Sequence, residues 1–307
     1  MAGFALDHVA LATRKVDAVC AFLGDALGLA RVDATLGSGT VPFFAIGDAA
    51  LGIFDVTNPY LDADASPGVH HMALRSSDPV AAADTHGLTL THGGRGPDGR
   101  QFAAVDPALT CGIRTHFIEP STYRPAASTI DRIDHLGIAS NDNAACGRVF
   151  SDVLGCPIES HETDIEIRNV TESFVSDKYG AIYHARPPEI LGGLRAMFIS
   201  VGDCDLEIMM DYDPSLTPQN SLGEEAGNTK GDQSAIANFI ARRGPGLAHV
   251  ALQTQDIDGL LAKLAAQGWR LIDTVGRPGG RGSRIGFVHP SNFAGGLLIH
   301  FVEPLRP

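Results

Sequence analysis

Two histidines interrupt apolar runs at matching places in the chain. His116 lies in "GIRTHFIEP" and His300 in "GGLLIHFVEP", each just before an acidic residue and a proline. A polar side chain that points from such a strand into the interior without a partner costs roughly 1–3 kcal/mol. A metal ion removes that cost, because imidazole nitrogen is a good ligand for first-row transition metals. A buried histidine held by ordinary hydrogen bonds is the alternative, and a single histidine does not decide between the two.

The elements that would position these histidines are repeated along the chain. "ALDHVALATRKVDAVCAFLGDALGLARV" is echoed by "RIDHLGIASNDNAACGRVFSDVLGCPIE", and "PGVHHMALRS" is echoed by "PGLAHVALQT". Each unit starts with an alternating strand pattern, continues with apolar residues at helical spacing and ends in further strand-like runs. The sequence therefore predicts four β-α-β-β-β units, starting near residues 5, 68, 132 and 246.

The chain divides into two halves at a linker rich in Pro, Ala and Ser, "STYRPAASTID". We expect two domains, at residues 1–124 and 125–307. Two segments of the second half have no counterpart in the first: one runs from about residue 160 to 193, and the other is "PSLTPQNSLGEEAGNTKGDQSAIANFIARRG". Because long insertions in compact domains often act as lids or binding loops, we place the chemistry in the second half.

The composition narrows the class of partner. The chain has 307 residues and a formal net charge of -13, which argues against binding to nucleic acid or to an anionic membrane surface. Its five cysteines form no C-x-x-C pair, which favours a reducing cytoplasm over a disulfide framework. We see neither a signal peptide nor an apolar stretch long enough to cross a membrane. We therefore expect a cytoplasmic protein that acts on a small molecule, and a homodimer stays open as its assembly.

These motifs resemble the vicinal oxygen chelate superfamily, which includes glyoxalase I, extradiol dioxygenases and methylmalonyl-CoA epimerase. The likeness is strongest to the epimerase branch, over roughly residues 132 to 304, and "IDHLGIA", "PPEILGGLRAMFISVGDCDLEIM" and the run from "SAIANFIARRGPGLAHVALQT" to "LLIHFVEP" carry it. The resemblance implies an α+β fold in which the four units form two cup-shaped sheets. It also implies one divalent metal ion in a cup, with a ligand on each of four strands.

Carried over residue by residue, the resemblance implies a metal site in the second half. Its ligands would be His135, Glu207, His249 and His300. The family normally has a glutamate at the fourth position, where this chain has His300. The set still holds a single carboxylate, so the net charge of metal and ligands is kept. Three imidazoles suit Zn, Co, Ni or Fe better than Mg, and we expect one divalent ion among Zn, Co, Ni, Mn and Fe.

The first half offers a poorer set at the matching positions, namely His8, Gly52, His71 and His116. Gly52 supplies no ligand, so this copy has three histidines at most. We interpret it as a duplicated scaffold that kept a polar pocket, with a second metal site as the alternative. The neighbouring His70 leaves open which of the two adjacent histidines points inwards.

The resemblance also suggests a reaction. Epimerisation next to a carbonyl needs a base that removes a proton and an electrophile that holds the resulting negative charge. The family's catalytic glutamate falls on Glu189 in "PPEILGG", although a solvated loop glutamate is the alternative. We expect a divalent-metal-dependent epimerase or isomerase that acts on a small-molecule carbonyl substrate. Two other classes stay open: an extradiol-type ring-cleaving dioxygenase, and a non-catalytic metabolite-binding or resistance protein.

Overall fold

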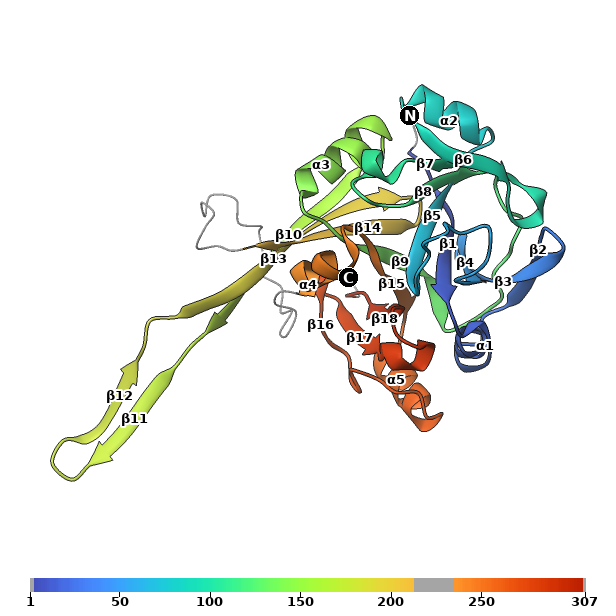
Figure 1. Cartoon of the computed structure of the whole chain (residues 1–307). Helices are drawn as coiled ribbons and strands as arrows, with labels where there is room; N and C mark the ends of the chain where they lie inside the picture. Colours follow the sequence, from blue (N-terminus) through green and yellow to red (C-terminus); the bar gives the residue numbers. More distant parts are fainter. Residues whose placement is uncertain (1–2, 213–234, 306–307) are drawn as a thin grey trace.

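Two eight-stranded sheets built on the same plan form the framework of the protein (Figure 1). The computed structural model describes residues 3–212 and 235–305. The strands of the first sheet are β1 (Leu6–Thr13), β2 (Arg31–Leu36), β3 (Gly39–Ile46), β4 (Ala49–Asp55), β5 (Gly68–Arg75), β6 (Leu90–Arg95), β7 (Gln101–Val105) and β8 (Thr115–Ile118). Those of the second are β9 (Ile130–Ala139), β10 (Ile158–Arg168), β13 (Glu189–Val201), β14 (Cys204–Tyr212), β15 (Gly246–Thr254), β16 (Arg277–Pro278), β17 (Arg284–Val288) and β18 (Leu298–Glu303).

The strand order confirms the four predicted β-α-β-β-β units. It is β2-β3-β4-β1-β5-β8-β7-β6 in the first sheet and β10-β13-β14-β9-β15-β18-β17-β16 in the second. In each sheet two units meet at their first strands, which pair antiparallel: β1 with β5, and β9 with β15. The first strand of every unit also pairs in parallel with the last strand of that unit. The expected α+β fold with two curled sheets is therefore confirmed.

A helix follows the first strand of each unit. These helices are α1 (Val16–Ala21), α2 (Pro79–Thr85), α3 (Asn143–Gly147) and α5 (Ile257–Ala266), and α1 and α3 continue into π-helical turns. Three of the four begin at an aspartate. Asp78, Asp142 and Asp256 accept a hydrogen bond from the backbone N–H three residues later, at 3.0, 2.9 and 2.9 Å. Such caps satisfy donors that the first helical turn leaves unpaired, so the sequence itself marks where each helix starts.

The alternation of side chains along the strands separates the site from the core. On β9, Leu136 and Ile138 belong to the main apolar core, whereas His135 lines a cavity on the other face. That core is continuous between the halves, and the Phe22 ring lies 4.9 Å from Trp269, centroid to centroid, in an edge-on contact. Burial of these apolar side chains joins the two halves into one body.

The two insertions of the second half differ in structure. Strands β10 and β13 run past the edge of their sheet and lead to a hairpin of β11 (Thr171–Ser176) and β12 (Gly180–Ala185), which projects away from the body (Figure 1). Most of the second insertion, residues 213–234, lies outside the described residues, and its end forms helix α4 (Ala235–Arg243). None of the helices in the described ranges is long and apolar enough to cross a membrane.

Candidate metal centre and cavity

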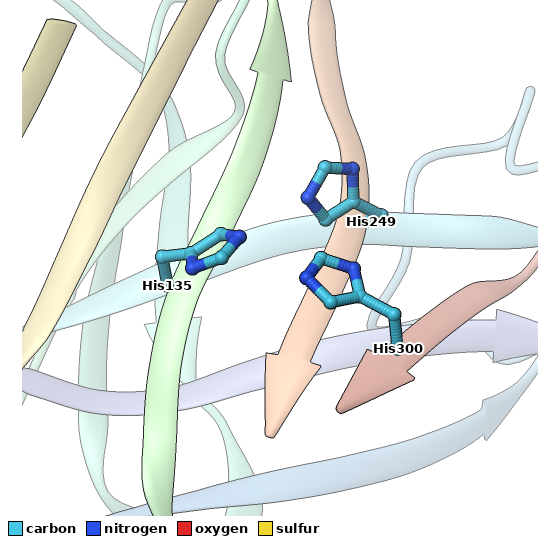
Figure 2. A group of neighbouring side chains, drawn as sticks. All are labelled: His135, His249 and His300. Atoms are coloured by element: carbon cyan, nitrogen blue, oxygen red, sulfur yellow. The ribbon is translucent and has the colours of Figure 1, made fainter. Parts of the chain in front are cut away.

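Three imidazole rings from three strands point at one another in the second sheet. Figure 2 shows His135 of β9, His249 of β15 and His300 of β18 facing a common point. One ring nitrogen of each lies within 4.8 Å of the others, and all three residues are buried. The fourth predicted ligand lies beside them, since Oε2 of Glu207 is 3.4 Å from Nε2 of His135 and 3.3 Å from Nε2 of His249. The structure thus brings all four residues together.

Strand register explains why Glu207 and His249 meet. Both pair with Gly137, the first from β14 and the second from β15, so they lie on either side of one residue of β9. A Cβ atom at position 137 would lie 2.0 Å from Cε1 and 2.2 Å from Nε2 of His249. The imidazole therefore occupies the space that any other residue at 137 would fill, and this glycine is required by the close approach of a ring.

A second row of the sheet holds the other two histidines. His135 and His300 both pair with Ala251 of β15, which separates them by one strand. Because alanine projects only a methyl group into the cup, their ring centroids approach to 5.0 Å. Small residues thus alternate with the candidate ligands in both rows.

A buried carboxylate orients His135. Nδ1 of His135 lies 2.9 Å from Oδ2 of Asp134, which leaves Nε2 of the ring facing the cluster. Asp134 is held in turn by Arg132 at 2.9 Å and by Arg281 at 3.1 Å. A carboxylate behind a metal-binding histidine fixes the tautomer of the ring and raises its basicity.

The donor set fits a divalent transition metal. Nε2 of His135, Nε2 of His249 and Nδ1 of His300 are buried and make no hydrogen bond. Oε2 of Glu207 lies at ion-pair distance from Nε2 of His135 and Nε2 of His249, but neither contact has the geometry of a hydrogen bond. With metal–ligand bonds of about 2.0–2.1 Å, neighbouring ligands of a tetrahedral ion are roughly 3.4 Å apart. The distances from Glu207 to the two imidazoles match that edge.

Charge is balanced within the cluster even without a metal ion. Burial would lower the pKa of His135, but Glu207 and Asp134 outweigh it and raise that pKa to about 9. Burial opposes ionisation of Glu207 as well, yet His135 and His249 hold its pKa well below the ordinary value. Burial and the two other histidines keep the pKa of His300 far below its usual range. A proton on His135 therefore balances Glu207, and a bound cation would replace that proton.

The cluster opens into a cavity of about 470 Å³, a size that suits a small molecule. One wall of this cavity is apolar, and it consists of Leu194, Ala196, Phe198, Met209, Ile236 and Phe239. Polar groups also line it: the carboxylates of Glu162 and Asp164, and the guanidinium groups of Arg242, Arg243 and Arg281. The cavity can therefore hold a ligand with an apolar part and an anionic or carbonyl group.

Comparison with known proteins shows the family to which the chain belongs. Models of the Glyoxalase/Bleomycin resistance protein/Dioxygenase superfamily match residues 5–107 and residues 198–287, one in each half. The chain belongs to this superfamily. The resemblance seen in the sequence, that of the vicinal oxygen chelate proteins, is thereby confirmed.

Three similar proteins illustrate the range of this likeness. The mitochondrial methylmalonyl-CoA epimerase of Dictyostelium discoideum is 33% identical over 74 residues, which are 24% of this chain and 44% of that protein. A mutant 4-hydroxymandelate synthase from Streptomyces coelicolor covers 100% of this chain and 95% of its own, at 15% identity and a TM-score of 0.61. The match to methylmalonyl-CoA epimerase from Mycobacterium tuberculosis covers 59% of this chain and 93% of that protein, at 27% identity and a TM-score of 0.39. The chain thus spans less than half the length of the Dictyostelium relative.

The structure does not bring Glu189 to the cluster. It begins β13, is 61% exposed at its side chain and pairs with Arg168 at 3.2 Å, near the base of the projecting hairpin. From position 189 to Phe198, which pairs with Glu207, β13 extends roughly 30 Å at about 3.3 Å per residue. Glu189 is therefore far from Glu207 in space although the two are close in sequence, because β13 is long and extends beyond the sheet.

Glu162 of β10 is a cavity residue that the sequence did not indicate. It lines the same cavity as the four candidate ligands. It belongs to "ESHETDIEIR", where alternating polar residues are typical of any half-exposed strand. Nothing in that pattern distinguishes Glu162 from Glu159 or His161, so no sequence signal could have selected it.

The matching place in the first half is packed differently. The His71 and His116 rings stack at 3.8 Å, and Nδ1 of His71 lies 2.9 Å from Nδ1 of His70. Where the second half has Glu207, the first has Gly52, and a Cβ there would lie 2.6 Å from the ring of Phe43. An aromatic ring thus fills the space of the missing carboxylate. Within residues 3–212 and 235–305, the only group of three or more potential metal ligands with close donor atoms is the one in the second half.

Proposed function

We propose that this protein is a divalent-metal-dependent epimerase or isomerase that removes a proton from the carbon next to a carbonyl group. The observation that carries the proposal is the meeting of three imidazoles and one carboxylate beside an apolar-walled cavity. A divalent ion held there would polarise a carbonyl oxygen and stabilise the negative charge that develops when the proton leaves. The similarity to methylmalonyl-CoA epimerase supports this reaction class, with a coenzyme A thioester as the first substrate to test.

The chain's own residues have separate roles in this proposal. Four residues would hold the ion, namely His135, Glu207, His249 and His300, and Asp134 orients His135. The apolar wall around Phe198 binds the hydrocarbon part of the substrate and excludes water, which strengthens the electrostatic interactions within the cavity.

Positive charge at the cavity suits an anionic substrate. Arg242 and Arg243 come from the last turn of α4, and both line the cavity. Guanidinium groups bind carboxylates and phosphates through paired hydrogen bonds. We therefore expect a substrate that carries such a group.

Metal analysis combined with isotope exchange tests the proposal. Protein purified without chelators should hold about one redox-inert divalent ion per chain, and it should exchange solvent deuterium into methylmalonyl-CoA next to the carbonyl. His135→Ala and Glu207→Ala should each lose the metal and the exchange. Glu189→Gln is the matched control: its exposed position predicts unchanged metal content and exchange.

Two other outcomes would replace the proposal. Iron in the site together with oxygen consumption on a catechol would identify a ring-cleaving dioxygenase, for which two histidines and one carboxylate are a known iron set. Protein that binds a metabolite but no stoichiometric metal would identify a non-catalytic binding protein.

A further inference from the structure

Glu162 lines the same cavity as the candidate metal centre. It lies on β10 in register with Ala196 of β13, and both residues line the cavity together with the four candidate ligands. Glu189, by contrast, is outside the cavity. Glu162 is thus a carboxylate that a substrate bound at the metal could reach.

The backbone of a tight turn holds the Glu162 carboxylate in place. The backbone N–H of Arg281 donates a hydrogen bond to Oε2 of Glu162 at 3.2 Å. A Cβ at the preceding residue, Gly280, would lie 2.8 Å from the same oxygen, so the glycine makes room for the carboxylate. The turn therefore positions this group without covering it by a side chain.

The guanidinium group of Arg281 forms ion pairs with carboxylates other than Glu162. The Arg281 side chain pairs with Asp205 at 2.6 Å and with Asp134 at 3.1 Å, and it stacks over Phe198. It thus supports the orientation of His135 through Asp134. Glu162 receives only the backbone N–H of this residue as a hydrogen bond.

The surroundings of Glu162 favour proton exchange near neutral pH. Burial is the largest effect and Asp164 on the same strand adds to it; together with Glu207 of β14 they raise the pKa of Glu162 to about 7. Arg281, from the turn before β17, opposes this shift. A carboxyl group with a pKa near the working pH is present in both protonation states and can accept and return a proton.

We propose that Glu162 is the general base of the reaction, a role that rests on the proposed function. Its carboxylate takes the proton from the carbon next to the substrate carbonyl and becomes a carboxylic acid, while the electron pair of the C–H bond moves towards the carbonyl oxygen. For inversion at carbon a proton from solvent arrives on the opposite face, and the Glu162 carboxylic acid gives up its own proton to solvent, which regenerates the carboxylate. Atoms and charge balance without an oxidant or another reactant.

Glu162→Gln tests this role, with Glu159→Gln as the matched control. Glu159 lies on the same strand and contacts the same arginine at 3.4 Å, but its side chain is 45% exposed and is not part of this cavity. Glu162→Gln should keep its metal and lose deuterium exchange by at least about 100-fold, the usual scale for removal of a general base. Glu159→Gln should keep both.

A second measurement needs neither metal nor turnover. In metal-free protein labelled with ¹³C at glutamate carboxyl groups, one signal should titrate near pH 7 in wild type and vanish in Glu162→Gln. Normal exchange in Glu162→Gln, or the lack of that signal in wild type, would overturn this role and leave the proposed function standing. Wild-type protein that exchanges no acyl substrate would overturn the proposed function, and this role with it.

Discussion

Gly137 allows the metal centre to be tested without removing any ligand. A Cβ at this position would lie 2.2 Å from Nε2 of His249. Since non-bonded heavy atoms rest about 3.5–4.0 Å apart, Gly137→Ala forces the ring to move by more than ~1 Å. Metal–ligand distances tolerate deviations of only about 0.2 Å. Position 137 lies within β9 and has no positive φ, so the alanine itself fits the backbone.

The expected effect is a large loss of metal affinity in a protein that still folds. Losing His249 as one of four ligands should weaken binding at least about 100-fold, which corresponds to ~2.7 kcal/mol. Calorimetric titration of Zn²⁺ into chelator-treated protein measures this difference. Gly147→Ala is the matched control, because its added Cβ would meet only the end of the flexible Met197 side chain, at 3.2 Å. It should bind Zn²⁺ as wild type does.

Two outcomes would contradict the proposed role of His249 as a metal ligand. If Gly137→Ala folds, as judged by circular dichroism, and binds Zn²⁺ as tightly as wild type, His249 does not bind metal in the position described. If Gly147→Ala loses affinity to the same extent, the loss reports general destabilisation and not the displaced ring.

Two further predictions concern carboxylates near the site. Asp134→Asn should lower Zn²⁺ affinity by roughly 10–100-fold, because His135 loses the group that orients it. Asp7→Asn, the matching change beside His8 in the first half, should leave Zn²⁺ affinity unchanged, and an equal loss in both would contradict the assignment. For Glu162, a folded-state pKa of about 7 lies above the ordinary value of 4.5, so the folded state binds its proton more tightly than the unfolded state. As the pH rises from 4.5 to 8, the free energy of unfolding of metal-free wild type should therefore fall by about 1–3 kcal/mol relative to that of Glu162→Gln. This energy is reduced because the side chain is partly exposed to solvent. Urea unfolding at pH 5 and pH 8 measures this, and a constant difference would count against the shift.

Much of the fold could be predicted from the sequence, because each unit carries its own local signals. Alternating runs around His8 and His135 predicted strands, and aspartates such as Asp142 and Asp256 mark the starts of helices. The repeated order of these signals predicted four units. The family resemblance then predicted which strands carry His249 and the other candidate ligands.

The carboxylate that we propose as the general base could not be predicted in the same way. Glu189 matched the family by its place before "LRAMFIS", but its distance from the site depends on how far β10 and β13 run beyond the sheet. Glu162 lies on the cavity side of β10, and the turn at Gly280, 118 residues later in the chain, holds its carboxylate there. Contacts over such a separation leave no local pattern in either segment.

The sequence by itself determined the strands and their order, since both follow from side-chain alternation and repeated motifs, and the family resemblance then assigned the candidate ligands to those strands. The sequence also indicated which half carries the full donor set, because Gly52 stands where the second half has Glu207. Only the tertiary structure showed how the space around those positions is filled. In the second half Gly137 leaves space for the His249 ring, and Glu207 completes the set. In the first half Ala10 occupies the position equivalent to Gly137, and Phe43 covers Gly52. The two halves differ in the residues that lie opposite one another on neighbouring strands. Strand register sets these pairs, and residues far apart in the sequence share space in the sheet because of it.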